Sequence, residues 1–445
     1  MRSDAGVVIV GGGQAGAWAA ATLRDEGFDG RVVLVGEEAH IPYERPPLSK
    51  AVLSGAQAAE SCAVKPADFY GERNIELRLG CRAGALDRER RRLELTDGES
   101  LRYEQLVLAT GARPRRLALP GSELAGIHYL RTLDDSLALR ARLRPDARVV
   151  LIGGGYIGLE LGSVYAALGS RVSVVEMTSG LLPGVDRDLV RVLSRRLQQR
   201  FAAVMLETTV TGLHEEPDGI RVKLEGAGAA ESEQVYEKVL VAVGRRPQTD
   251  GLGLENTRVA LDAQGFVQVD PQRRTHEPSI YAIGDITGEP MLAHKAAHEG
   301  RVAAQAVAGK KTAFEPQAIP AVVFTDPEIA WCGLTESQAK QLGRDVTIAR
   351  FPWAASGRAL TLGQSDGVTK LLIDPETQRV LGVGIAGSGA GEMIAEGVLA
   401  VEMAALASDL SFSIHPHPTL SESLMEAADV FFGHSTHVYR PSRAR

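Results

Sequence analysis

Two clusters of glycines have the spacing of a phosphate-binding turn. Both follow the pattern G-x-G-x-x-G, and they consist of Gly11, Gly13 and Gly16 and of Gly153, Gly155 and Gly158. In such a turn the first glycine permits a tight bend, the second lets the backbone approach a pyrophosphate, and the third lets helix and strand pack closely. The N–H groups and the positive dipole end of the helix that follows then bind the phosphates. Each cluster therefore predicts a dinucleotide-binding site.

An acidic residue follows each cluster at the end of the next apolar run. Glu37 comes after the first cluster and Glu176 after the second, where a carboxylate accepts hydrogen bonds from a ribose diol. Glu176 also repels a 2′-phosphate, and residues 177–179 include no arginine to hold one. We expect NADH rather than NADPH in the second site, with Arg187 as a nearby cation that could fold back.

The elements that must position these clusters have the pattern of a βαβ unit. Val7–Val10 is an apolar, β-branched run, which predicts a strand buried on both faces. The other segments of the pattern are 17–28 and 31–35 in the first copy and 148–152, 159–169 and 171–175 in the second. A single glycine-rich turn also occurs as a plain structural loop, whereas two copies in the same context favour two nucleotide-binding domains.

The rest of the chain supplies crossovers and a third domain. Segments 106–115 and 239–247 are apolar strands that end abruptly in glycine and basic residues, as expected where a chain crosses between domains. From about residue 320, strand-like runs alternate with helical stretches and no phosphate-binding loop occurs, which predicts an α+β domain. The basic end 440–445 is expected to be solvated.

Composition excludes several classes of protein. The 445 residues carry a net charge of −7, which argues against nucleic acid or a membrane surface as a partner. No apolar run approaches the ~20 residues of a membrane span. Because residues 1–14 leave no room for a signal peptide, we expect a cytoplasmic protein. The three cysteines, Cys62, Cys81 and Cys332, form no C-x-x-C pair, so we expect neither a metal site nor a local redox pair.

The sequence is similar to the two-dinucleotide-binding flavoprotein reductases over essentially its whole length. Besides the glycine clusters, the resemblance rests on the turn Ala109-Thr110-Gly111 and on IYAIGDI (280–286). It implies an α/β fold with two Rossmann-like dinucleotide-binding domains and a C-terminal α+β dimerisation domain, assembled as a homodimer. The implied boundaries are 1–116 and 245–316 for the FAD-binding domain, 117–244 for the NAD-binding domain and 317–445 for the interface domain.

The resemblance also implies which residues contact the cofactors. Asp285 would hydrogen-bond the FAD ribityl chain, and Arg131 would contact FAD unless it forms a salt bridge at a domain hinge. Lys50 would lie beside the flavin N5 and pair with Glu160 near the nicotinamide, because a carboxylate lets a buried lysine stay charged. The alternative is a surface lysine and an ordinary helix residue. The other implied cofactor contacts, besides the glycines and acids above, are Thr110, Gly111, Val210, Gly244 and Ala293.

Two subfamilies are represented in different parts of the chain. ERPPLSK (44–50) resembles the reductases that supply ferredoxins and rubredoxins, whereas HPHPTLSE (415–422) and much of the remainder resemble dihydrolipoamide dehydrogenase. The latter enzymes carry a disulfide in the run C-x-x-x-x-C-x-x-S-K. Aligning the end of that run on Ser49-Lys50 places Ile41 and Pro46 at the cysteine positions. We therefore expect no disulfide relay beside the flavin, unless the fold brings a distant cysteine there.

His417 and Glu422 resemble the dyad that lipoamide dehydrogenases supply from the partner subunit. In those enzymes the carboxylate orients the imidazole, which acts as an acid–base. Here His417 either protonates another substrate or belongs to a segment retained for the dimer interface, with Pro416 and Pro418 as rigid positions. His415 is expected to be structural.

These features lead to three functional hypotheses. The leading one is a homodimeric FAD enzyme that passes electrons from NADH to a non-disulfide acceptor, which ERPPLSK indicates to be a ferredoxin or rubredoxin. The alternative is a lipoamide-dehydrogenase relative that acts on a thiol, persulfide, quinone or other small substrate at the dimer interface, with His417 as acid–base. The third is a flavin-holding subunit without turnover, against which Lys50, Glu160 and both glycine clusters argue.

Overall fold

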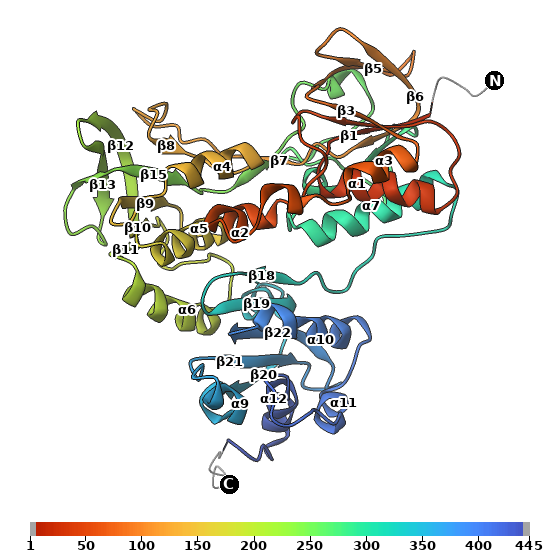
Figure 1. Cartoon of the computed structure of the whole chain (residues 1–445). Helices are drawn as coiled ribbons and strands as arrows, with labels where there is room; N and C mark the ends of the chain where they lie inside the picture. Colours follow the sequence, from red (N-terminus) through yellow and green to blue (C-terminus); the bar gives the residue numbers. More distant parts are fainter. Residues whose placement is uncertain (1–5, 439–445) are drawn as a thin grey trace. The chain divides into compact units, whose positions relative to one another are not determined.

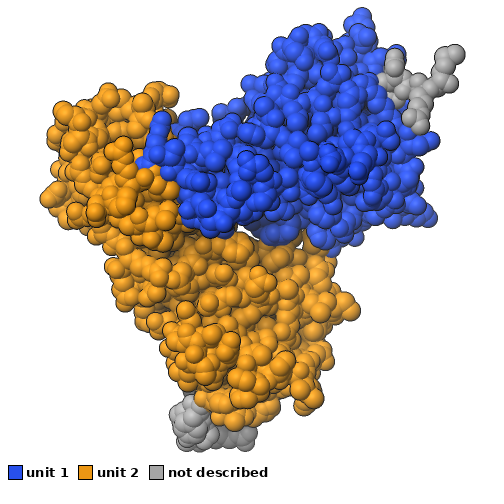
Figure 2. Space-filling view, viewed as in Figure 1, with its two compact units in different colours: residues 1–116, 129–142, 243–315 blue, residues 117–128, 143–242, 316–445 orange. Residues whose placement is uncertain are grey.

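The computed structural model describes residues 6–438 of the chain (Figure 1). The chain divides into two compact units, each assembled from several segments (Figure 2). Unit 1 consists of Met1–Arg116, Tyr129–Arg142 and Val243–Glu315, and unit 2 of Leu117–His128, Leu143–Ala242 and Pro316–Arg445. The basic end 440–445, for which we expect a solvated position, lies outside the described residues.

A sheet with a parallel centre is the frame of unit 1. Its strand order is β3-β2-β1-β6-β5-β4, and β17 also pairs with β6. The strands are β1 (Gly6–Val10), β2 (Val32–Gly36), β3 (Ile75–Leu79), β4 (Ala83–Asp87), β5 (Arg92–Leu95), β6 (Ser100–Leu108) and β17 (Ile280–Ala282). The helices are α1 (Gln14–Asp25), α2 (Ala51–Ser54), α3 (Ala67–Glu72), α4 (Leu133–Ala141) and α7 (Ala293–Val307).

Alternate residues of β1 face two different packing layers. Val7 and Ile9 pack with alanines of α1 and α7, whereas Val8 and Val10 pack with the layer that contains residues of β4 and β5. Because side chains along a strand alternate between its faces, a strand covered on both sides must be apolar throughout. This burial explains the continuous apolar run before the first glycine cluster.

The two predicted crossover segments pair with each other in unit 1. β7 (Ala112–Pro114) and β16 (Arg245–Pro247) form an antiparallel pair. The N–H of Gln248 donates to the carbonyl oxygen of Gly111 at 2.8 Å, and the hydroxyl of Thr110 donates to the carbonyl oxygen of Gln248 at 2.6 Å. The Ala-Thr-Gly turn therefore fastens the chain where it returns to this unit.

Unit 2 contains a parallel sheet around the second glycine cluster and an antiparallel sheet of three strands. The parallel order is β11-β10-β9-β15-β8, and the antiparallel order is β12-β13-β14. The elements are β8 (Ile127–His128), β9 (Arg148–Ile152), α5 (Tyr156–Ala167), β10 (Arg171–Val175), α6 (Arg187–Arg200), β11 (Ala203–Met205), β12 (Thr208–Glu216), β13 (Gly219–Gly226), β14 (Glu233–Tyr236) and β15 (Lys238–Val241).

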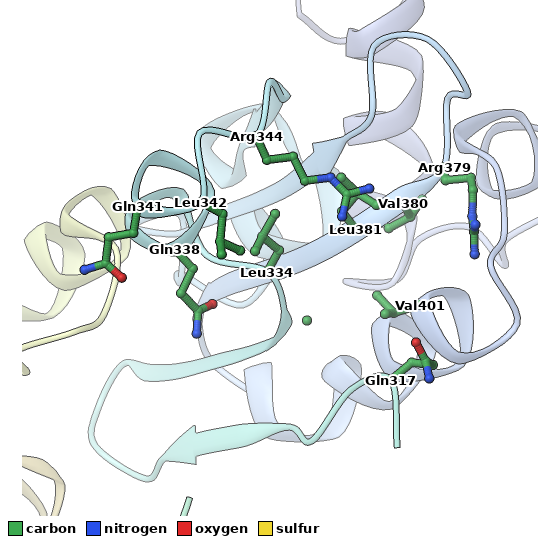
Figure 3. Close-up of a pocket in the computed structure, with 11 residues that line it drawn as sticks. Gln317, Leu334, Gln338, Gln341, Leu342, Arg344, Arg379, Val380, Leu381 and Val401 are labelled. Atoms are coloured by element: carbon green, nitrogen blue, oxygen red, sulfur yellow. The ribbon is translucent and has the colours of Figure 1, made fainter. Parts of the chain in front are cut away.

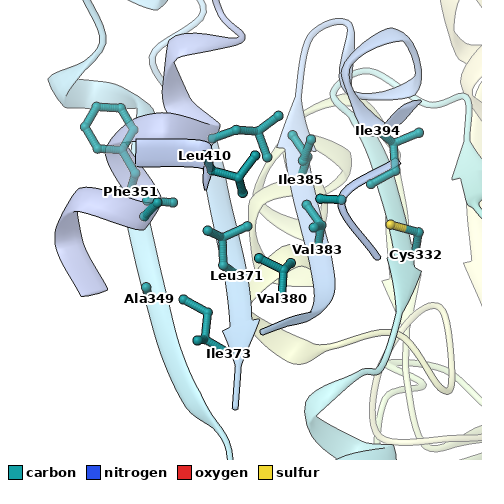
Figure 4. Packing of buried hydrophobic residues seen from close by; sticks show 14 of the residues in the cluster. Cys332, Ala349, Phe351, Leu371, Ile373, Val380, Val383, Ile385, Ile394 and Leu410 are labelled. Atoms are coloured by element: carbon teal, nitrogen blue, oxygen red, sulfur yellow. The ribbon is translucent and has the colours of Figure 1, made fainter. Parts of the chain in front are cut away.

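The C-terminal part of unit 2 is an antiparallel sheet with helices packed on it. The strand order is β18-β19-β22-β21-β20. Cys332, Phe351, Leu371 and Ile385 belong to a core that also includes residues of the helices (Figure 4). The elements are β18 (Ala321–Val323), β19 (Glu328–Gly333), α8 (Glu336–Gln341), β20 (Thr347–Pro352), α9 (Gly357–Thr361), β21 (Val368–Ile373), β22 (Val380–Gly387), α10 (Ala390–Glu402), α11 (Ala407–Phe412) and α12 (Glu422–Phe432).

The predicted fold class is confirmed: parallel sheets with helices surround both glycine clusters, and the C-terminal part is α+β. The helices begin earlier than the sequence predicts, since α1 starts at Gln14 and α5 at Tyr156, inside the clusters. Among residues 6–438, every helix is too short or too polar to cross a lipid bilayer. The predicted division into three domains stays a prediction.

Candidate dinucleotide and acid–base sites

The first glycine cluster has the geometry that a pyrophosphate requires. Gly11 has φ +125°, and a Cβ there would lie 2.0 Å from the carbonyl oxygen of Ala109. A Cβ on Gly16 would lie 2.0 Å from the carbonyl oxygen of Gly11, whereas a Cβ on Gly13 would meet nothing within 4 Å. No side chain caps α1, and its first turn contains no acidic residue. The backbone beside Gly13 is therefore open to an anion, and residues of this cluster fit FAD.

The second glycine cluster repeats this geometry in unit 2. Gly153 has φ +106°, and a Cβ on Gly158 would lie 2.3 Å from the Gly153 carbonyl oxygen. Gly155 again faces open space, and no side chain caps α5. The same physical test therefore indicates a second dinucleotide site, and the expectation that this site takes NADH stays a prediction.

Gly16, which is packed against a backbone carbonyl, and Gly13, which faces open space, should respond differently to substitution by alanine. Gly16→Ala is expected to destabilise the apoprotein by ~1–3 kcal/mol, because the new Cβ overlaps a backbone carbonyl and the turn must move. Gly13→Ala is expected to leave the apoprotein's unfolding temperature unchanged and to weaken FAD binding about tenfold or more, or ~1.4 kcal/mol. Thermal unfolding of apoprotein and a fluorescence titration with FAD measure the two effects. Equal behaviour of the two variants in both assays would contradict this assignment.

Three arginines gather around Asp285 in unit 1. Nη2 of Arg131 and Nη1 of Arg245 lie 3.3 and 3.2 Å from Oδ2 of Asp285. Arg45 donates to the carbonyl oxygen of Arg131 at 2.7 Å and pairs with Glu38 at 2.7 Å. Burial, followed by repulsion from Arg45, lowers the pKa of Arg131 to about 10. Positive charge exceeds negative charge here, which suits an anionic cofactor.

The sequence-based reasoning missed two members of this group. Arg45 stands in ERPPLSK and Arg245 in VGRRP, so both motifs were visible, but nothing in their spacing places them beside residue 285. Their contacts join segments separated by 86 and 40 residues. The sequence left two roles open for Arg131, an FAD contact and a salt bridge at a domain hinge. Its ion pair with Asp285 is compatible with both, so the role of Arg131 in binding FAD stays a prediction.

A buried glutamate holds the loop that carries Asp285. Oε2 of Glu299, whose side chain is fully buried, accepts a hydrogen bond from the Gly284 N–H at 2.6 Å. Lys295 Nζ lies 3.3 Å from the same carboxylate and donates to the Gly284 carbonyl oxygen at 3.2 Å. Both side chains come from α7, whose first residue is the predicted cofactor contact Ala293. This helix therefore positions the Gly-Asp turn.

The remaining predicted cofactor contacts lie at element ends or on a buried strand. Glu37 directly follows β2, its side chain is 55% exposed, and Gln248 donates to it at 3.3 Å. Gly111 and Gly244 have φ of +74° and +102°, which favours glycine. Val210 is a buried residue of β12. Their contacts with a cofactor stay predictions.

Lys50 and Glu160 occupy different compact units. Nζ of Lys50 donates to the Pro46 carbonyl oxygen at 3.1 Å and to Ser49 Oγ at 3.2 Å. Glu160 is a buried residue of α5, and its Oε1 accepts a hydrogen bond from the Phe324 N–H at 3.1 Å. Both side chains are thus held in place within their own units, and the pairing between them stays a prediction.

Glu176 is buried and accepts three hydrogen bonds. Its carboxylate accepts from the Gly154 N–H at 2.7 Å and from the N–H and hydroxyl of Thr178 at 2.8 and 2.7 Å. Arg187 does not fold back towards it, because its guanidinium donates to the carbonyl oxygens of Leu181, Leu182 and Val185. The Glu176 carboxylate is therefore fixed and Arg187 is engaged elsewhere, and the predicted opposition of Glu176 to a 2′-phosphate stays a prediction.

His417 and Glu422 form a hydrogen-bonded pair in unit 2. Nδ1 of His417 lies 2.9 Å from Oε1 of Glu422, and Oε2 of Glu422 accepts from the Thr419 N–H at 2.7 Å. Although partial burial opposes it, hydrogen bonds from Thr419 and His417 lower the pKa of Glu422. The His417 side chain is 72% exposed, so its Nε2 is accessible. His415, in contrast, is 7% exposed and bonded to Glu396 at 2.8 Å, as a structural residue would be.

The three cysteines are free and buried, and each belongs to a different apolar cluster. Burial is the largest cause that raises the pKa of Cys62 and Cys81, and it raises the pKa of Cys332 to about 12. Thiolate formation is therefore disfavoured at all three positions.

A pocket of about 600 Å³ lies in the C-terminal part of unit 2 (Figure 3). Leu334, Val380 and Val401 line it together with Gln338 and Arg344 (Figure 3). Its lining includes none of the predicted site residues.

The comparisons with known proteins agree with this arrangement. Residues 5–300 match the pyridine nucleotide-disulphide oxidoreductase model, and residues 319–428 match the dimerisation domain of the same family. The chain belongs to the pyridine nucleotide-disulphide oxidoreductase family, and it is an FAD-dependent oxidoreductase that uses NAD(P)H. The matched dimerisation domain supports a homodimer.

Individual relatives make the likeness more specific. The chain is 45% identical over 342 residues to dihydrolipoyl dehydrogenase of Vibrio parahaemolyticus, covering 76% of this chain and 70% of the relative. A persulfide reductase from A. fulgidus shares the fold at a TM-score of 0.85 and 24% identity, over 96% of this chain and 83% of that one. A ferredoxin reductase from Rhodopseudomonas palustris has a TM-score of 0.76 and 28% identity, over 95% and 99%.

The expectation of a ferredoxin or rubredoxin acceptor is therefore wrong. Relatives about 45% identical over most of the chain are named dihydrolipoyl dehydrogenase. The expectation rested on residues 44–50, and the structure gives that motif a local role: Arg45 binds Glu38 and the hydroxyl of Tyr43. These contacts shape the interior of unit 1 and carry no information about an electron acceptor.

Proposed function

We propose that this enzyme passes two electrons from NADH through FAD to a small acceptor at the dimer interface, with His417 as the acid–base. The observation that carries the proposal is the pair His417–Glu422: an exposed imidazole, hydrogen-bonded at 2.9 Å to a carboxylate that is itself held by a backbone N–H. The name dihydrolipoyl dehydrogenase of the relatives supports a sulfur substrate. Persulfides and quinones are further acceptors of the same two-electron class.

In the dyad, His417 transfers the proton and Glu422 orients the imidazole. When the Nδ1–H of His417 donates a hydrogen bond to Glu422, Nε2 is the ring nitrogen that gives a proton to the substrate or takes one from it. For a disulfide acceptor the balance is RS–SR + NADH + H⁺ → 2 RSH + NAD⁺, and His417 supplies a proton to a leaving thiolate. The first glycine cluster would hold FAD, which would supply the hydride-accepting and two-electron-transfer chemistry. Glu422, with its lowered pKa, stays ionised and orients the imidazole through their hydrogen bond.

We also propose that the enzyme works without a redox-active disulfide of its own. Ile41 and Pro46 stand at the aligned cysteine positions. The three cysteines are buried in separate clusters, and their raised pKa values oppose the thiolate that such a relay needs.

Anaerobic titration with NADH tests this proposal. We expect the flavin absorption to bleach without a long-wavelength thiolate-to-flavin band, and the reduced enzyme to be reoxidised by small disulfides, persulfides or quinones. The wild type and Cys62→Ser and Cys81→Ser variants should have the same spectra throughout. A thiolate band that disappears in either variant would contradict the proposed absence of a disulfide relay. Failure of every small acceptor would contradict the proposed reaction.

We propose NADH as the physiological donor because Glu176 is fixed by three hydrogen bonds and Arg187 is bound to backbone carbonyls. Met177, 72% exposed, directly follows this acid. Met177→Arg is expected to raise kcat/KM with NADPH by about tenfold, since a hydrogen bond to a charged group contributes ~1.5–3 kcal/mol. Met177→Gln, which adds no charge, is the matched control. Equal efficiencies of the wild type with NADH and NADPH would refute the preference.

A further inference from the structure

A second His–Glu pair lies one helical turn from the dyad. Nδ1 of His437 is 2.5 Å from Oε1 of Glu426, whose Oε2 accepts a hydrogen bond from Ser435 at 2.6 Å. The Glu426 side chain is 6% exposed and the His437 side chain 50% exposed. Because Glu422 and Glu426 are four residues apart on α12, they share one face of that helix. The two pairs are therefore neighbours in space.

His437 of the second pair affects the pKa of Glu422, the carboxylate of the first pair. His437, together with His417, is among the charges that lower the pKa of Glu422, against the opposing effect of partial burial. Glu422 is also the hydrogen-bond partner of His417. A change in the charge of His437 therefore alters the field at the group that orients His417.

Other charged groups on α12 and on elements near it have hydrogen-bond or ion-pair partners of their own. These groups are Arg350 of β20, Lys370 of β21, Asp409 of α11, the pair Asp429 and His434, and the pair His415 and Glu396.

We propose that His437, held by Glu426, is a positioning residue that sets the protonation equilibrium of His417. This inference rests on the proposed acid–base function of His417. Protonated His437 opposes the charging of His417, whereas neutral His437 leaves Glu426 as a net negative charge that favours the imidazolium. The two imidazoles and two carboxylates then titrate as one coupled system.

Titration of His417 in the FAD-bound dimer tests the proposal without any substrate. Histidine is labelled with ¹³C at Cε1, the His417 signal is assigned with His417→Asn, and its shift is followed against pH. His437→Gln is expected to raise the midpoint by about half a pH unit, because a nearby positive charge is lost. Glu426→Gln is expected to lower it by a similar amount, because a negative charge is lost. His434→Gln, a matched substitution beside Asp429, should cause a smaller change.

Opposite shifts in the two variants support the proposal, since a merely structural role would not give opposite signs. An unchanged midpoint in both, or shifts of the same sign, would overturn it. If His437→Gln fails to bind FAD or to dimerise, the sign of the Glu426→Gln shift decides. Turnover measured in parallel separates the two claims: if His417→Ala retains full activity, the proposed function fails, and the titration still decides the role of His437.

Discussion

His417→Ala is expected to lower turnover with a small two-electron acceptor by about 10²–10⁴-fold, the usual effect of removing a positioned proton donor. Reduction of the enzyme by NADH should keep its rate, because hydride transfer needs no proton from the dyad. Stopped-flow measurement of reduction by NADH and of reoxidation by the acceptor separates the two half-reactions. Glu422→Gln should give a smaller loss, because the imidazole remains but loses the carboxylate that orients it.

His434→Ala is the matched control for this experiment. Its side chain is 59% exposed and lies near a carboxylate, 3.9 Å from Asp429, but it is outside the dyad. Both half-reactions should be unchanged in this variant. If reoxidation of His417→Ala matched the wild type with every acceptor, His417 would be a structural residue of the interface segment, the alternative that the sequence left open.

Lys370→Met is expected to destabilise the protein by about 3–5 kcal/mol, the usual effect of breaking a buried ion pair from one side. The Lys370 side chain is fully buried, and its Nζ lies 2.6, 2.8 and 2.6 Å from carboxylate oxygens of Asp186, Asp188 and Glu336. Without the ammonium, three carboxylates share a partly buried site in which Arg350 pairs with Asp188 and Glu336. Chemical denaturation of the FAD-bound dimer measures the loss.

Arg344→Met is the control for the loss of an ion pair at the surface. Arg344 lies 3.4 Å from Asp374, and its side chain is 48% exposed, so its removal should cost less than about 1 kcal/mol. Similar losses in Lys370→Met and Arg344→Met would contradict the importance of the buried group.

The same network predicts how stability responds to pH. Burial opposes ionisation of Asp188, but contacts with Lys370 and Arg350 outweigh it and lower its pKa. A carboxyl group whose pKa is lower in the folded state stabilises the protein above its unfolded pKa, and this stabilisation is lost as the pH falls. Lys370→Met should therefore show a weaker loss of stability on acidification than the wild type.

Features that depend on residues close together in the chain could be predicted from the sequence. Strand, glycine turn and helix follow each other within about 20 residues, and both the positive φ of Gly11 and the close approach of Gly16 to the Gly11 carbonyl belong to that turn. Both βαβ units could therefore be predicted. His417 and Glu422 are five residues apart, and their pairing was expected from the resemblance of residues 415–422 to lipoamide dehydrogenases. The helix starts were misplaced because the third glycine of each cluster is itself a helical residue.

Which distant charged residues share a site became evident from the fold. Asp285 meets Arg131 and Arg245 across 154 and 40 residues, and Lys370 meets Asp188 across 182. Such pairs carry no periodic signal in the sequence, because Coulomb attraction depends on distance in space. The prediction of a ferredoxin or rubredoxin acceptor was wrong for the same reason. Residues 44–50 were interpreted as the signature of a partner protein, whereas Arg45 of this motif forms its contacts inside unit 1. The role of a charged residue in such a motif depends on the groups that the fold places around it.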